Sequence, residues 1–481
     1  MTTIPDDGLA ERAGPADAGT ATRPDARHRT GLAFAVLAVV QASLIFTITL
    51  ISVPLPDIGR EFGLGSADLV LVQAAYGLPY SGLLLFGGRL ADRFGGRRVF
   101  AAGLAVFGLA SATAAVVPGF EALVAVRFTQ GIGAALTAPA AVAVLRALFP
   151  SPAAFGRAMA TWGGMSVLGA TLGPLVSGVV TTWVSWRWMF AVPVAVAVLG
   201  LAVTRGMFPE GRAGSSSVVG LDPAGAVLAT LGISVGSYGL IASGDHPWSS
   251  TTVLVPLGVG VVLLAAFVAV ERRVRDPLLP PGFAVEPRRL VGVVGILLAA
   301  AASGLVSFVL SVYLQQVRDW SPLETAGGFV PFAVALIASN SAAARLVGRF
   351  GAGPVTVAGL LVGAGGFALL TGIAPDSSYP LGLAPGLVLL PIGASLIFSG
   401  TAVLTTTNVP PHQVGLAGGV MNTAMELGPT VGMAALMAVA ATRAEVVNGY
   451  AWAFGTAAVV YVVAALVAIP LLRRATAPAA S

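Results

Sequence analysis

The sequence contains no lysine and no cysteine, and only 10% of its 481 residues are charged. All 26 basic residues are therefore arginine. Without lysine the chain cannot build a phosphate-binding P-loop or a Schiff base, which argues against an ATP-driven pump and against imine chemistry. Without cysteine it has no disulfide, no thiolate nucleophile and no cysteine metal site.

Histidine is scarce as well. His28, His246 and His412 are far apart and lack the spacing of metal ligands. No nucleophile–base pair stands out, so we predict a protein that is not an enzyme and has no cofactor and no metal. The formal charge of +5 could suggest a nucleic-acid partner. The arginines, however, gather in short loops between apolar runs, which indicates contact with membrane lipid and no nucleic acid.

Apolar residues are abundant: 56% of the chain is hydrophobic and the mean hydropathy is +0.89. Soluble domains carry about 25% charged residues, so the composition indicates an integral membrane protein. In lipid each span must satisfy its own backbone, which favours an all-α polytopic protein. We count about fourteen apolar runs of spanning length. They lie near residues 31–55, 68–88, 98–118, 121–147, 157–181, 187–206, 222–243, 251–271, 289–314, 325–345, 353–373, 380–404, 413–441 and 448–472.

Arginine placement predicts the orientation of these spans. The loops after every second span are rich in arginine, as are the segments before the first span and after the last. The opposite loops hold few. By the positive-inside rule both termini face the cytoplasm, as expected of a multi-pass protein of the plasma membrane.

One arginine-rich loop occurs twice. The segment GGRLADRFGGRR spans residues 87–98, and RLVGRFG returns at 345–351 without the aspartate. Arg345 stands 256 residues after Arg89 (345 minus 89). That spacing gives about 32 residues per helix for eight intervening helices but about 43 for six, and short loops favour eight. The economical arrangement is six helices, two inserted helices and six more, with parallel repeats.

The domain boundaries follow from this count. We expect a disordered cytoplasmic tail, a first six-helix bundle, two additional helices, a second six-helix bundle and a short cytoplasmic tail. These segments comprise residues 1–28, 29–206, 207–280, 281–474 and 475–481.

Several segments, taken in order, resemble the major facilitator superfamily, and specifically its fourteen-helix drug:proton antiporter branch. The loop at 87–98 is similar to the family motif between helices 2 and 3. RFTQGIG at 127–133 is similar to the helix 4 motif, and GATLGPLVSG at 169–178 to the helix 5 motif of exporters. WRWMF at 186–190 and LDPAG at 221–225 are also typical of the branch. The resemblance implies a major facilitator fold and drug export coupled to protons.

In the loop motif, glycine permits close approach and a tight turn. Asp92 could accept hydrogen bonds from a neighbouring helix N-terminus and so stabilise one transport conformation. The arginines could pair with it, or serve only as topology markers. The gating candidates are Gly88, Asp92, Arg93, Gly95, Arg97 and Arg98.

Arg127 lies inside a span, where a charge is expensive and usually functional. The resemblance implies a role in proton transfer; the alternative is a structural arginine bonded to carbonyls. Many relatives carry an aspartate in helix 1 where this chain has Thr47, which cannot titrate. Glu426 on the thirteenth span is the best alternative proton carrier, and Asp68 is a second. Each could instead be a hydrated or structural carboxyl.

Gly169, Gly173, Pro174 and Gly178 form the exporter motif, although a packing face of small residues could look the same. A substrate cavity with apolar walls and a few polar groups would suit lipophilic molecules. Its candidate residues, each of which could instead be a packing residue, are Gln41, Gln73, Tyr76, Trp162, Tyr313, Asn340 and Asn422.

Taken together, the sequence predicts a monomeric secondary transporter that exports lipophilic drugs or antibiotics by proton antiport and confers resistance. Two alternatives stay open. One is an importer or facilitator of a small nutrient. The other is a membrane sensor that transports nothing.

Overall fold

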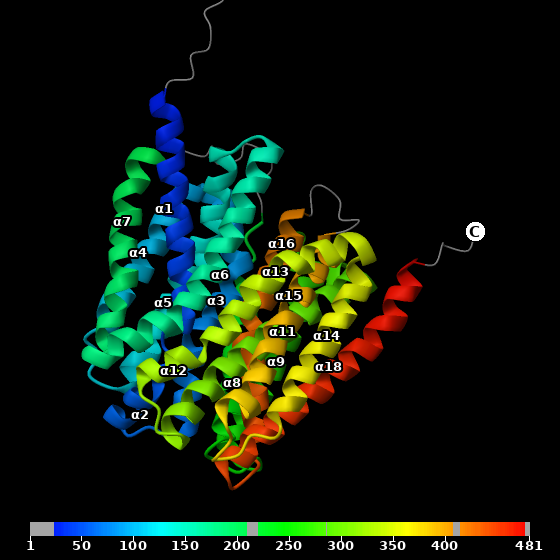
Figure 1. Ribbon diagram of the computed structural model, residues 1–481. Helices are drawn as coiled ribbons and strands as arrows, with labels where there is room; N and C mark the ends of the chain where they lie inside the picture. The colour runs from blue at the N-terminus through cyan, green and yellow to red at the C-terminus, as the bar shows by residue number, and fades with distance from the viewer. Residues whose placement is uncertain (1–23, 209–219, 285, 407–413, 477–481) are drawn as a thin grey trace, which may run out of the picture.

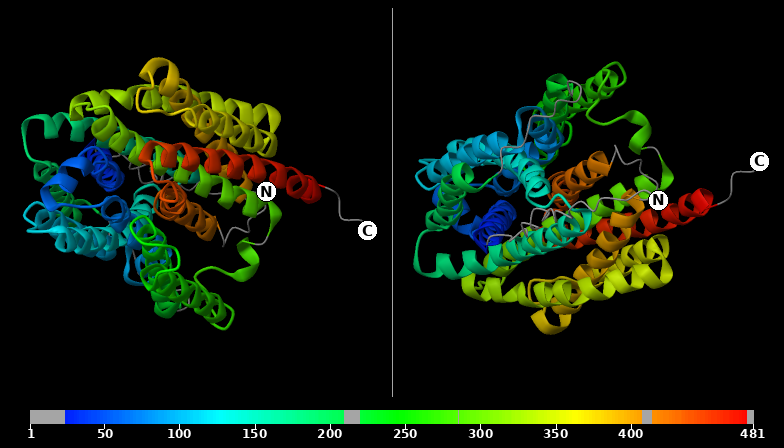
Figure 2. Two further views of the ribbon diagram at one scale, coloured as in Figure 1. Left: turned by 90° about the horizontal axis from the view of Figure 1, so that it is seen from below. Right: turned by 90° about the horizontal axis from the view of Figure 1, so that it is seen from above.

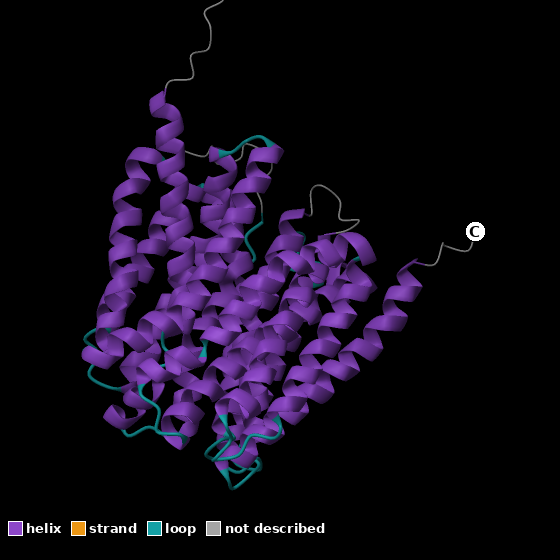
Figure 3. Cartoon of the chain, viewed as in Figure 1, coloured by secondary structure: helices purple, strands orange, loops and turns teal. Residues whose placement is uncertain are grey.

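The computed structural model describes residues 24–208, 220–284, 286–406 and 414–476 (Figure 1). Within these ranges the regular structure is helical, and short loops join the helices (Figure 3). Among the described residues, twelve helices are long and apolar enough to cross a membrane. Two other long helices fall outside that set: α4 (Gly96–Ala114) and α6 (Pro152–Trp183), whose apolar part is limited to Leu168–Trp183. The prediction of an all-helical membrane protein is confirmed, while length and composition give twelve spans instead of fourteen.

The first part of the chain (blue to green in Figure 1) forms one bundle, which contains α4, α6, four further long helices and two short elements. The long helices are α1 (Pro24–Thr49), α3 (Ser66–Phe94), α5 (Phe120–Leu148) and α7 (Ala191–Met207), and the short elements are α2 (Leu55–Phe62) and the 3₁₀ turn η1 (Trp186–Phe190).

The last part (lime to red) forms a second bundle that contains several π-helical turns. Its elements are α10 (Pro281–Ala284), α11 (Pro287–Val312), η2 (Tyr313–Val317), α12 (Pro322–Gly328), α13 (Val330–Phe350), α14 (Ala352–Leu370), η3 (Tyr379–Leu383), α15 (Ala384–Thr406), α16 (Val414–Leu427), η5 (Gly428–Gly432), α17 (Met433–Ala440) and α18 (Val446–Thr476).

The two bundles repeat the same packing pattern. In the first, α5 packs against α3 and α4, and α7 packs against α1 and α4. In the second, α15 packs against α13 and α14, and α18 packs against α11 and α14. The loops that carry the repeated sequence also match, because Gly95 (φ 91°) and Gly351 (φ 86°) both adopt a positive φ between consecutive helices. The structure therefore contains the duplication that the repeated loop indicates.

The inserted helices α8 (Pro223–Ala242) and α9 (Thr251–Glu271) pack against each other, and α8 contacts α3 and α17. Figure 2 shows this green pair at the edge of the molecule, beside the two bundles. Their observed bounds differ from the predicted spans 222–243 and 251–271 by one residue at most.

The two bundles meet along α3, which contacts α16 and η5, and along α6, which contacts α12. At the end of the molecule that holds α2 and α12, opposite the start of α1 in Figure 1, Gln315 Nε2 donates to the Val53 carbonyl over 2.7 Å. This hydrogen bond joins the two halves at that end.

Helix α1 begins at Pro24, before the predicted start of the first bundle at residue 29, while its candidate membrane span runs from Arg29 to Thr49. Residues 1–23 and 477–481 lie outside the described part of the chain.

Candidate functional site

Arg127 of α5 is the centre of the polar site in the first bundle. Its side chain is fully buried, Nη1 donates to the Thr47 carbonyl over 3.0 Å, and the guanidinium lies 5.3 Å from the centre of the Tyr76 ring. Its Nε and Nη2 have no hydrogen-bond partner among the described residues. A buried charge with unpaired donors is costly, so the arrangement is typical of a functional arginine.

Close packing of α3 on α5 places Tyr76 over this guanidinium. Gly131 lies one turn after Arg127, and a Cβ there would approach Pro79 Cγ to 2.6 Å. Only glycine leaves room for α3 at this distance. Gln130, three residues after Arg127, bonds a different partner: its Nε2 donates to Ser111 Oγ on α4 over 2.9 Å.

Thr47 serves Arg127 through its backbone. Its hydroxyl donates to the Ser43 carbonyl over 2.7 Å, and its own carbonyl accepts from the arginine because α1 ends two residues later, at Thr49. The position where relatives carry an acid thus still contacts Arg127, but with a peptide dipole in place of a titrating group.

Further buried polar side chains lie in the same bundle. The Tyr76 hydroxyl donates to the Leu44 carbonyl over 3.0 Å, and Gln41 Nε2 donates to Ser166 Oγ over 3.1 Å. Gln73 and Trp162 are buried on α3 and α6. The structure therefore gathers four of the predicted cavity residues on one bundle: Gln41, Gln73, Tyr76 and Trp162.

Glu426 approaches from the second bundle. It lies on α16, is 6% exposed, and stands close enough to Tyr76 and Tyr80 for its charge to act on both phenols. A Cβ on Gly77 would lie 3.9 Å from the Glu426 carbonyl oxygen, so α3 and α16 touch here. Tyr76 of α3 thus lies within electrostatic reach of both the arginine of one half and the acid of the other.

Other predicted residues lie outside this cluster. The Asp68 carboxylate accepts from the Gly65 backbone N–H over 3.2 Å and caps α3. The Tyr313 hydroxyl donates to the Ala374 carbonyl over 2.6 Å within the second bundle. Asn340 and Asn422 are exposed on α13 and α16.

In the arginine-rich loop the close approach falls on Gly87. A Cβ on Gly87 would overlap the Ala135 carbonyl of α5, whereas one on Gly88 would make an ordinary contact of 3.7 Å with Pro139. The expected role of Gly88 therefore belongs to its neighbour. Gly95 does make the predicted tight turn.

Arg89 has partners that the sequence does not reveal. Its guanidinium donates to the carbonyls of Gly220 (2.7 Å) and Asp276 (2.5 Å) and to that of Pro277. These carbonyls lie just before α8 and just after α9, so Arg89 joins the loop to the inserted pair. The sequence gives no local signal for such long-range bonds.

Asp92 is exposed, and the positive charges of Arg146 on α5 and of Arg89 act on its carboxylate. Residues 407–413, which precede α16, lie outside the described residues. Arg93 lies 5.7 Å from the centre of the Phe94 ring, and Arg98 is exposed, whereas Arg97 is half-buried.

The glycine stripe on α6 faces two different helices. A Cβ on Gly169 or Gly173 would overlap α1 at Ala42 or Thr49, whereas one on Gly178 would lie 2.7 Å from the Pro322 carbonyl of α12. Pro174 is buried between them. The stripe therefore contacts both halves of the protein.

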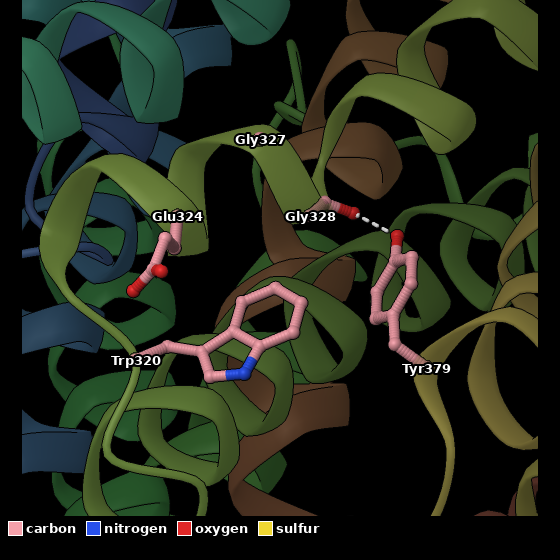
Figure 4. Close-up of a pocket in the computed structure, with 5 residues that line it drawn as sticks. All are labelled: Trp320, Glu324, Gly327, Gly328 and Tyr379. Carbon is pink, nitrogen blue, oxygen red and sulfur yellow. Dashed lines mark hydrogen bonds between the residues drawn. The ribbon is translucent and has the colours of Figure 1, made fainter.

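A cavity of about 420 Å³ lies in the second bundle, apart from the polar cluster (Figure 4). Trp320, Glu324, Gly327, Gly328 and Tyr379 line it, and the Tyr379 hydroxyl donates to the Gly328 carbonyl over 2.7 Å. None of the predicted cavity residues lines this space.

Comparison with known proteins identifies the family. The sequence model of the Major Facilitator Superfamily matches residues 36–433 and 293–481. The chain belongs to the major facilitator superfamily. It is 36% identical to the puromycin resistance protein pur8 of Streptomyces alboniger, over 88% of this chain and 84% of that protein. It is also 36% identical to the cephamycin export protein CmcT of Amycolatopsis lactamdurans, over 90% and 91%.

Solved structures support the same fold. A peptide transporter POT bound to sulfate matches with a TM-score of 0.66 at 18% identity, over 92% of this chain and 94% of that chain. The human organic anion transporter MFSD10 matches with a TM-score of 0.61 at 18% identity, over 93% and 100%. The predicted major facilitator fold and the prediction of a transporter that is not an enzyme are thus confirmed.

Proposed function

We propose that this protein exports lipophilic antibiotics across the plasma membrane in exchange for protons. The names of its relatives, which include resistance proteins for puromycin and lincomycin and an export protein for cephamycin, support drug efflux. The observation that carries the proton step is the buried Arg127 with unpaired donors, whose ring partner Tyr76 also lies within reach of the charge of Glu426 from the other half of the molecule.

Glu426 is the proposed proton carrier. Of the buried carboxyls among the described residues, Asp222 and Glu271 lie on the inserted helices and only Glu426 lies at the interface of the two bundles. A proton bound there alters the charge that faces Tyr76 and the Arg127 guanidinium behind it. Because the two groups belong to different bundles, protonation would change the balance between conformations.

Fourteen membrane spans, with both termini in the cytoplasm, are part of this proposal. Helices α4 and α6 would complete the count, because α4 packs between α5 and α7 as α14 packs between α15 and α18. The arginine-rich ends then face the cytoplasm, and the end that holds α2 and α12 faces outward. The Gln315–Val53 hydrogen bond would close the outer end, so the structure would correspond to an inward-facing state.

A transport assay tests the proposal. The chain is expressed in a pump-deficient strain and the accumulation of puromycin, lincomycin and a cephamycin is measured with and without a protonophore. We expect lower accumulation of at least one compound, restored to the vector level by the protonophore. Export that persists without a proton gradient would refute proton coupling.

Everted vesicles separate the alternatives. An exporter concentrates drug inside everted vesicles when the lumen is acidified, whereas an importer depletes it, and a sensor produces no flux. Asp92→Asn, compared at equal membrane abundance, tests whether the Asp92 carboxylate stabilises one transport conformation by accepting hydrogen bonds from a neighbouring helix N-terminus: we expect export to fall about tenfold, equivalent to about 1.4 kcal/mol. Full export by this variant would refute this role.

A further inference from the structure

A second pair of acidic residues lies far from Arg127, at the root of the inserted helices. Asp222 stands immediately before α8, and Glu271 is the last residue of α9. Each is only 3% exposed. The helices are antiparallel neighbours, so these residues share one end of the pair, the end at which α3 presents Arg89.

One oxygen of each carboxyl has a clear structural partner. Asp222 Oδ1 accepts from the Gly225 backbone N–H over 2.8 Å and caps α8. Glu271 Oε2 accepts from the Leu279 backbone N–H over 2.9 Å and fixes the turn after α9. These bonds hold both carboxyl groups in place.

The other two oxygens face each other. Asp222 Oδ2 and Glu271 Oε1 are buried and have no donor among the described residues. A Cβ on Gly225 would lie 2.9 Å from Glu271 Oε1 and closer still to Asp222 Oδ2, so both oxygens converge on the space that this glycine leaves. The two carboxyl groups are within hydrogen-bonding reach of one another.

No positive side chain is bonded to either carboxyl among the described residues. The Arg89 guanidinium donates instead to the backbone carbonyls of Gly220, Asp276 and Pro277. The arginines of the turn after α9, and Asp276 with them, are exposed. They are Arg272, Arg273 and Arg275. Of the described elements that contact α8, α17 and the turn η5 contain no ionisable residue.

We propose that Asp222 and Glu271 share a single proton, which acts as a clasp between the ends of α8 and α9. Two ionised carboxylates at this distance would repel, and each would keep an unpaired oxygen. One proton between Oδ2 and Oε1 pairs both oxygens and removes the repulsion. The clasp also sets the spacing of the carbonyls that Arg89 bridges, so loss of the proton would loosen the arginine-rich loop.

Infrared spectroscopy tests the shared proton directly. The measurement uses Glu426→Gln protein, so that the proposed proton carrier does not contribute and the two proposals can fail separately. We expect the infrared spectrum recorded at about pH 7 to contain the carbonyl band of a protonated carboxylic acid. Titration to alkaline pH should remove it. Asp222→Asn and Glu271→Gln, made in the same background, should each lack it.

Thermal unfolding supplies a second measurement with matched variants. Asp222→Asn and Glu271→Gln keep the caps and replace the proton with an amide donor, so their melting temperatures should change little with pH. The shared proton binds only the folded state, so the wild-type melting temperature should fall by about 2–4 °C as the pair loses it on going to alkaline pH. Asp222→Ala, which removes cap and clasp together, should lower the melting temperature at every pH.

Two results would overturn the proposal. One is the absence of a carboxylic-acid band from the spectrum of the Glu426→Gln protein, or a band that neither amide substitution changes. The other is a wild-type melting temperature that rises with added Ca²⁺ or Na⁺ while those of the amide variants do not, because the pair would then bind a metal ion in place of the proton.

Discussion

Replacement of Arg127 by methionine should abolish export while it leaves the fold almost as stable as before. The reason is the unbalanced hydrogen bonding of the guanidinium. The structure gives Arg127 one charge-assisted hydrogen bond, to Thr47, and one cation–π contact, with Tyr76. Methionine has a similar length and fills the same space without a charge.

The magnitude follows from these contacts. Loss of the hydrogen bond costs about 1.5–3 kcal/mol, and loss of a desolvated cation–π contact costs about 2 kcal/mol. Against this, the substitution removes two buried donors, Nε and Nη2, that have no partner among the described residues. Each contributes a penalty of about 1–3 kcal/mol. The opposing contributions nearly cancel, so we expect a net change within about 2 kcal/mol, or within about 4 °C in melting temperature.

The assay compares purified protein and cells. Arg127→Met should melt within that range of the wild type, yet drug accumulation in cells that express it should equal the vector control. Arg60→Met is the matched control, because Arg60 is exposed and pairs with Asp57 at the surface. It should retain export. A fall in melting temperature well beyond about 10 °C, or export at the wild-type level, would show that Arg127 is a structural residue.

Three further outcomes follow from the contacts described above. Glu426→Gln should lose proton-driven export but retain drug–drug exchange in vesicles; intact proton-driven export would eliminate it as the carrier. Gly178→Val should separate α6 from α12 and reduce export, whereas Gly365→Val, whose Cβ would meet nothing within 4 Å, should not; equal effects would contradict the contact between the halves. The hydrogen bond from Arg187 lowers the pKa of Glu61, so the stabilisation that it gives is present at neutral pH and is lost as the pH falls through that lowered value. Glu61→Gln should therefore weaken the dependence of the melting temperature on pH at acidic pH. An unchanged pH dependence would contradict a stabilising role for this contact.

Features that the sequence predicts well are those written in a local pattern. The apolar runs locate the inserted helices to within one residue, and the repeated loop predicts two glycines with the same positive φ. Arg127 is recognisable as buried because its neighbours are apolar over a full span. These predictions succeed because a bilayer imposes its length and polarity on each helix separately.

Features that the sequence misses depend on contacts between distant segments. The partners of Arg89 lie 131 and 187 residues away, so no periodicity could indicate them. The close contact at Gly87 instead of Gly88 depends on the rotation of α3 against α5, which one residue changes by about 100°. Gln130 points to α4 for the same reason. The sequence of a helix shows which of its faces is apolar. Because small residues cover most of the surface of these helices, the sequence does not determine how each helix is rotated against its neighbour.

Several buried polar atoms of the first bundle lack a hydrogen-bond partner among the described residues, which indicates that this bundle binds a ligand or a proton. The side-chain oxygens of Gln41, Gln73 and Gln130 are buried without a donor among the described residues, and two nitrogens of Arg127 are buried without an acceptor. Folded proteins normally pair such groups, since each unpaired one is costly. In this structure the donors and acceptors left over in this half do not pair with one another. A ligand that enters between the helices would satisfy them, and the proposed proton carrier, Glu426, lies on the opposite half, where α16 contacts α3.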